Sequence, residues 1–79
     1  MRIATITVFS KSEVETLRNL FPQGSTVKLD KLNDEHARIK SGTYGTVKTV
    51  DDFGTIQVKW ANGVECGVIP FVDSFERVE

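Results

Sequence analysis

The sequence has few of the residues that build metal centres, disulfide frameworks and membrane spans. One cysteine and one histidine among 79 residues exclude an internal disulfide and leave too few ligands for a cysteine-based zinc site. Two prolines and six glycines exclude a collagen-like or low-complexity chain. No apolar run approaches the about 20 residues that cross a bilayer, and residues 1–9 lack the long apolar stretch of a secretory signal. We therefore expect a cytoplasmic protein.

Neither sign of charge dominates the chain. Ten Lys and Arg against eleven Asp and Glu give a net charge of −1, which excludes a disordered acidic or basic tail. The charges are unevenly spread, however, since residues 1–50 hold eight basic and five acidic side chains. A modest basic face, able to contact nucleic acid, is one interpretation of this excess, and an ordinary solvated surface is the other. The cations concerned are Lys28, Lys31, Arg38, Lys40 and Lys48.

The first part of the chain predicts a helix over residues 10–21. Ser10 and Glu13 have the spacing of a capping box, in which each side chain accepts a hydrogen bond from the other residue's backbone N–H. Pro22 and Gly24 end the helix. An apolar stripe at helical spacing is expected to face the core, and consists of Val14, Leu17, Leu20 and Phe21. Before the helix, the β-branched residues of segment 1–9 predict a possible extra strand.

The rest of the chain predicts short strands and turns. Alternating apolar residues mark strands over 26–30, 43–50, 55–60, 64–68 and 75–78. Residues 33–42 predict a long surface loop, and Asn62-Gly63 is a strong hairpin signal. Closure would protect the edges of such short strands. We therefore predict one mainly β domain over residues 1–79. It is a small five-stranded SH3-like barrel over residues 25–79, with the short N-terminal α-helix packed on it.

Four segments together resemble a known family. They are Phe21-Pro22-x-Gly24-x-x-Val27-x-Leu29, Gly42-Thr43-x-Gly45-Thr46-Val47, Val50-Asp51-Asp52-x-Gly54-x-Ile56-x-Val58-x-Trp60-x-Asn62-Gly63 and Ile69-Pro70-x-Val72-Asp73-x-Phe75. Over residues 13–79 the chain resembles the small SH3-like-barrel family of bacterial and phage proteins catalogued as domain of unknown function 4314. The resemblance implies that fold and a phage or mobile-element setting, but no activity and no catalytic residues. Ala61 stands where the family usually has Asp, and the loop lacks the family's Asp-Asp-Pro start.

The reactive side chains predict no enzyme, no metal site and no cofactor. Cys66 falls on the inward side of an expected strand and His36 in the distant loop, so they do not suggest a nucleophile and its base. The paired acids Asp51-Asp52 and Asp34-Glu35 lack the alternate spacing of a calcium loop and are read as turn residues.

We predict instead a non-catalytic adaptor that binds another protein. Its candidate partner-binding residues are four aromatic side chains from different strands and turns, together with loop residues: Tyr44, Phe53, Trp60, Phe71, Asp34, His36 and Arg38. The alternative is a nucleic-acid-binding barrel that uses the five cations of the basic face. A third hypothesis is self-association through edge pairing of residues 3–8, so a monomer or a weak homodimer is expected.

Overall fold

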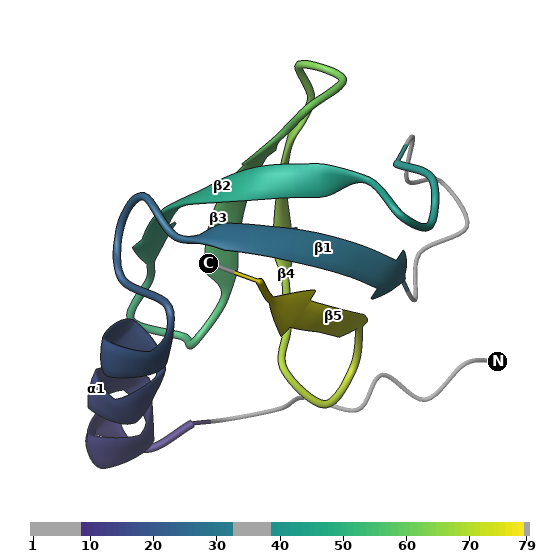
Figure 1. Ribbon diagram of the computed structural model, residues 1–79. Helices are drawn as coiled ribbons and strands as arrows, with labels where there is room; N and C mark the ends of the chain where they lie inside the picture. The colour runs from purple at the N-terminus through teal and green to yellow at the C-terminus, as the bar shows by residue number, and fades with distance from the viewer. Residues whose placement is uncertain (1–8, 33–38, 79) are drawn as a thin grey trace, which may run out of the picture.

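The computed structural model describes residues 9–32 and 39–78, which together make up the fold (Figure 1). Within these two stretches one helix precedes five strands. The elements are α1 (Lys11–Leu20), β1 (Thr26–Lys31), β2 (Tyr44–Val50), β3 (Ile56–Trp60), β4 (Glu65–Val68) and β5 (Ser74–Arg77). The prediction of a mainly β chain with five strands after a short helix is therefore confirmed. The strand expected over residues 1–9 lies outside the described stretches, except for Phe9.

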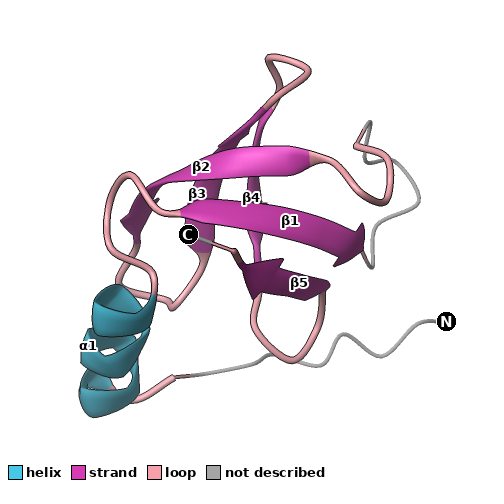
Figure 2. Ribbon diagram, in the orientation of Figure 1, coloured by secondary structure: helices cyan, strands magenta, loops and turns pink. Residues whose placement is uncertain are grey.

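The five strands form one antiparallel sheet in the order β4-β3-β2-β1-β5 (Figure 2). This sheet is open, because the described parts of β4 and β5 each pair with one neighbour and not with each other. The closed form of the barrel is thus not found. Between the two edge strands the turn at Ile69–Asp73 holds Pro70, which has no N–H to donate, and Phe71, whose φ of 70° is incompatible with a strand. Ladder pairing therefore stops at this turn.

Helix α1 begins with the predicted capping box and is held to the sheet by Arg18. Ser10 is the N-cap, and both hydrogen bonds of the capping box with Glu13 are formed, at 2.9 and 3.1 Å. Arg18 anchors the helix to the end of β2, since its guanidinium donates to the carbonyl of Val50 at 3.2 Å and to Asp52 at 2.9 Å. The helix therefore stands against the β2–β3 turn (Figure 1).

The core lies between α1 and the inner face of the sheet. Alternate residues of the strands supply it, as the sequence pattern predicts. The side chains that are almost completely buried are Val27, Leu29, Val47, Ile56, Val58, Trp60 and Val68. Val14 and Leu17 of the predicted inward stripe are buried and Phe21 packs against the core, but Leu20 is 54% exposed, so the prediction is wrong for Leu20 alone. No helix among the described residues is long and apolar enough to span a membrane.

Candidate functional site

The turn between β4 and β5 presents an aromatic ring in an unusual backbone conformation. Phe71 has a φ of 70°, which costs a non-glycine residue free energy because its Cβ crowds the backbone, and its side chain is 92% exposed. The turn around it is well fixed. Asp73 accepts a hydrogen bond from the backbone N–H of Ile69 at 2.8 Å, and the carbonyl of Ile69 accepts from the N–H of Asp73 at 2.9 Å. A rigid turn thus holds the ring of Phe71 out of the core.

Phe71 forms one wall of a groove beside α1. Its ring stacks on that of Phe9, with ring centroids 6.3 Å apart. Phe9 in turn lies on Gly54, where an added Cβ would meet the ring at 2.4 Å. The groove has a volume of about 240 Å³. We call it the helix–turn groove, and its lining residues are Phe9, Ser12, Glu13, Thr16, Leu17, Leu20 and Phe71.

The two ends of the helix–turn groove carry opposite charges. Glu13 lines the end at the first turn of α1, next to Phe9. Its hydrogen bonds with the backbone and side chain of Ser10 hold the pKa of the carboxyl below its usual value of 4.5, so it is ionised at neutral pH. At the other end the guanidinium of Arg77 donates to the carbonyl of Leu20 at 3.1 Å. The groove therefore has an anion in its lining at one end and a cation next to Leu20 at the other.

A second surface lies on the outer face of the sheet, opposite the core. Tyr44 is half exposed there and sits directly across from Lys28, whose Nζ lies 5.9 Å from the centre of the ring. Thr46 faces Thr26 on one side and Lys59 on the other. Tyr44, Thr26, Thr46 and Lys59 border a hollow of about 270 Å³. We call this surface the outer sheet face and define it by Thr26, Lys28, Tyr44, Thr46, Lys48, Lys59 and Glu65.

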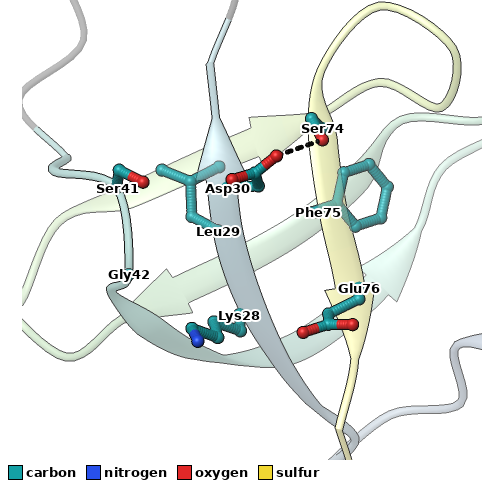
Figure 3. Close-up of a pocket in the computed structure, with 8 residues that line it drawn as sticks. All are labelled: Lys28, Leu29, Asp30, Ser41, Gly42, Ser74, Phe75 and Glu76. Atoms are coloured by element: carbon teal, nitrogen blue, oxygen red, sulfur yellow. Dashed lines mark hydrogen bonds between the residues drawn. The ribbon is translucent and has the colours of Figure 1, made fainter.

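A larger hollow, of about 470 Å³, lies next to it between β1, β5 and residues 41–42 (Figure 3). Lys28 and Glu76 face each other across β1 and β5, and Asp30 accepts a hydrogen bond from Ser74 at 2.8 Å. One cation and two acids line this hollow, so it has no strong preference for a ligand of one charge. Lys48 and Glu65 form an ion pair elsewhere on the outer sheet face, so the excess positive charge of this face comes from its other two lysines, Lys28 and Lys59.

The aromatic residues expected to share one rim are separated. Trp60 is 1% exposed, and its Nε1 donates to the carbonyl of Cys66 at 3.2 Å, so the expectation that it meets a partner is wrong. Its ring fills the space above Gly45 in the core. Tyr44 begins β2, whereas α1 stands at the far end of that strand, about 20 Å away by strand rise. Phe53 is 79% exposed in the turn beside Gly54.

Some of the other predicted site residues lie in the described stretches, and the remaining ones lie outside them. Lys28 and Lys48 both point from the outer sheet face, while Lys31 is exposed at the end of β1 and Lys40 in the segment before β2. Asp34, His36 and Arg38 lie outside the described residues. Within the described stretches, no group of three or more His, Cys, Asp or Glu residues is placed to hold a metal ion.

Sequence reasoning missed most residues of these surfaces, and three of them matter most for binding. Phe9 and Leu20 belong to the helix–turn groove, and Lys59 belongs to the outer sheet face. The alternation around Lys59 places it outward, which is a signal that could have found it. No comparable signal exists for Phe9, because its exposure depends on a turn about 60 residues later in the chain.

A comparison with known families decides the membership of the chain. The sequence profile of one family matches residues 10–78, which include α1 and all five strands. The chain belongs to the family described as domain of unknown function (DUF4314). The resemblance to this family, as far as membership is concerned, is thereby confirmed. No curated protein and no solved structure matches the chain. The DUF4314 match includes Glu13, Leu20 and Phe71 of the helix–turn groove and also Arg77 next to it, and it begins directly after Phe9.

Proposed function

We propose that this DUF4314 chain is a non-catalytic binding module that takes an apolar segment of another protein chain into the helix–turn groove. One observation carries the proposal. Phe71 holds a 92% exposed aromatic ring at a φ of 70°, and such strain costs on the order of 1–3 kcal/mol. Residues with backbone strain of this kind are found mainly at functional sites, where the strained conformation is part of the function. Exposed aromatic anchors are also the residues that dominate binding energy at protein interfaces.

The lining of the groove supports a protein partner. Phe9, Leu17, Leu20 and Phe71 supply apolar surface, and Ser12 and Thr16 are the polar side chains along the helix. A groove beside a helix with a charged residue at each end fits an apolar segment that carries charges of its own at both ends. The proposal moves the binding site from the loop and aromatic rim expected from the sequence to the side of α1.

The fold and setting of the module are part of the proposal. Five short antiparallel strands with a tight turn before the last one support an SH3-like barrel that has remained open between β4 and β5. The family resemblance supports a phage or mobile-element setting, and the composition supports a cytoplasmic location.

Selection of peptides from a random display library would test the proposed groove. Peptides selected on the wild-type chain should bind Phe71→Asn about tenfold more weakly or worse, because the aromatic anchor is lost. Asn tolerates positive φ, so this variant should keep its fold. Phe53→Asn removes another exposed ring outside the groove lining and serves as the matched control. Equal affinity for Phe71→Asn and the wild type would refute the groove as the binding site.

The outer sheet face favours a second candidate function, the binding of single-stranded nucleic acid. Tyr44 offers a half-exposed ring on which a base can stack, and Lys28 and Lys59 lie around it. The acids Glu65 and Glu76 next to these lysines weaken the electrostatic attraction. Titration with short oligonucleotides should then shift the amide resonances of Lys28, Tyr44 and Lys59, and the shifts should vanish between about 50 and 200 mM salt. Unchanged resonances at low salt would remove this candidate.

A further inference from the structure

We propose that the helix–turn groove binds the same groove of a second copy of this chain, about a two-fold axis that sets the two α1 helices antiparallel. The inference rests on the proposed function of the groove as a protein-binding site and names the partner. A two-fold contact joins the same surface of two copies, with one copy turned end for end. Each residue at one end of the groove must therefore fit the residue at the opposite end of the other copy. The helix–turn groove meets this condition in both its apolar and its charged features.

The groove has an exposed apolar residue at each end, so the two-fold axis can bring the residue at one end against the residue at the other end of the second copy. Phe71 stands at the Glu13 end of the groove, because it stacks on Phe9, which directly precedes the N-cap of α1. Leu20 is 54% exposed at the other end. Glu13 and Leu20 are seven residues apart, which corresponds to about 10 Å along the helix. A two-fold axis through the middle of α1 therefore carries each Phe71 ring over the exposed Leu20 of the other copy.

The charged features follow the same rule. Glu13 lies at the end with Phe71, and Arg77 lies at the end with Leu20. After the exchange of ends, each Glu13 meets Arg77 of the other copy, which forms two ion pairs. A parallel arrangement would instead bring Glu13 against Glu13 and Arg77 against Arg77, which is repulsive. Antiparallel helices also place the opposite ends of their dipoles together.

A second copy supplies both the apolar residues and the charged ends that the groove requires of a partner, and the small groove limits the strength of the contact. The contact is confined to a groove along one helix of ten residues, and small interfaces belong to weak complexes, so the dimer should be weak. The outer sheet face lies on the side of the sheet away from the core and does not take part in this contact.

Analytical ultracentrifugation of the full chain from about 10 µM to about 1 mM tests the inference. The average mass should rise with concentration from one copy towards two. Phe71→Asn should shift the rise to about tenfold higher concentration or beyond, with the fold retained because Asn tolerates positive φ. Arg77→Glu should do the same, because it places two acids together at each end. Lys59→Glu makes the same charge change on the outer sheet face and should leave the curve unchanged.

A mixing experiment isolates the proposed ion pairs. Glu13→Lys and Arg77→Glu should each be monomeric alone, because like charges meet at both ends of either homodimer. An equimolar mixture should form a heterodimer, since each introduced charge then faces its opposite. Amide spectra of each variant alone would show that both are folded. A mixture that stays monomeric, or a Phe71→Asn chain that associates like the wild type, would overturn the inference.

The outcomes separate the two proposals. A wild-type chain that remains monomeric at about 1 mM refutes the second copy as the partner, while the displayed peptides still test the groove itself. If both proposals hold, a selected peptide should shift the mass back to that of one copy, because it competes for the same groove. Peptides that bind without changing the dimer would contradict the shared site.

Discussion

Gly45 shows how a single residue shapes the inner face of the sheet. It lies buried in β2, where an added Cβ would stand 2.4 Å from Cγ1 of Val58 and 2.7 Å from Cε3 of Trp60. Both neighbours are stiff and fully buried, so neither can move aside cheaply. We predict that Gly45→Ala lowers the free energy of unfolding by about 1–3 kcal/mol through overpacking. Urea unfolding monitored by tryptophan fluorescence measures this change in the free energy of unfolding.

Gly63 provides the control for this prediction. It has a φ of 88° in the β3–β4 turn, and no atom lies within 4 Å of an added Cβ. Gly63→Asn should therefore change the free energy of unfolding by less than about 0.5 kcal/mol, since Asn tolerates this region of φ. Equal effects of the two substitutions would mean that the space above Gly45 is not closely packed.

The sequence predicts the burial of some residues but not the conformation or contacts of others. Alternation puts Trp60 on the inward side, and the structure buries it, so including it among the partner-binding residues contradicts that pattern. The sequence singles out Phe71 as a candidate, but its positive φ carries no sequence signal, because the residue types favoured there are Gly and Asn. The contact of Phe71 with Phe9 joins distant parts of the chain and cannot be read from local pattern.

At the scale of elements, the capping box of α1 makes the stability of the chain depend on pH. The pKa of Glu13 lies below its usual value of 4.5 because Ser10 donates hydrogen bonds to the carboxylate. A lowered pKa in the folded state contributes stability that is complete above the unfolded pKa and is lost as the pH falls through the folded pKa. We predict that the stability advantage of the wild type over Glu13→Gln shrinks as the pH falls from about 5.5 to about 3.

Thermal unfolding of both chains across that pH range measures this difference. Gln keeps a hydrogen-bond acceptor at the same position of the helix but does not titrate, and every other carboxyl is common to both chains. Subtraction therefore removes the titration of Glu65, whose pKa is lowered by the hydrogen bond from Lys48. A difference that stays constant from about pH 6 to about pH 3 would show that Glu13 does not contribute as an ionised cap.

The elements themselves are largely predictable from the sequence, and their arrangement is less so. The predicted strands differ from the observed ones by one residue at most at each end, because alternation and turn residues are local signals. Closure of the sheet depends on whether β4 and β5 can meet, which the conformation at Pro70 and Phe71 decides. The exposure of Leu20 could not be predicted either. The periodicity of the helix shows which of its residues share a face, but not how far the rest of the protein covers that face.

For the whole molecule, the two sides of the sheet offer separate surfaces. The helix–turn groove lies along α1, whereas the outer sheet face carries Tyr44 and its lysines on β1, β2 and β3, and no residue belongs to both. A dimer formed through the groove would leave both outer sheet faces uncovered. The two candidate functions are therefore compatible, since occupation of one surface does not bury the other.

Self-association can arise in two ways that predict different behaviour of the whole molecule. The segment 3–8 is rich in β-branched residues, which predicts edge-to-edge pairing, whereas the helix–turn groove requires nothing before Phe9. Removal of residues 2–8, leaving Met1 joined to Phe9, distinguishes them. We predict that the truncated chain shows the same rise of mass with concentration as the wild type in analytical ultracentrifugation. Loss of association on truncation, with Phe71→Asn behaving as the wild type, would assign the contact to residues 3–8 instead.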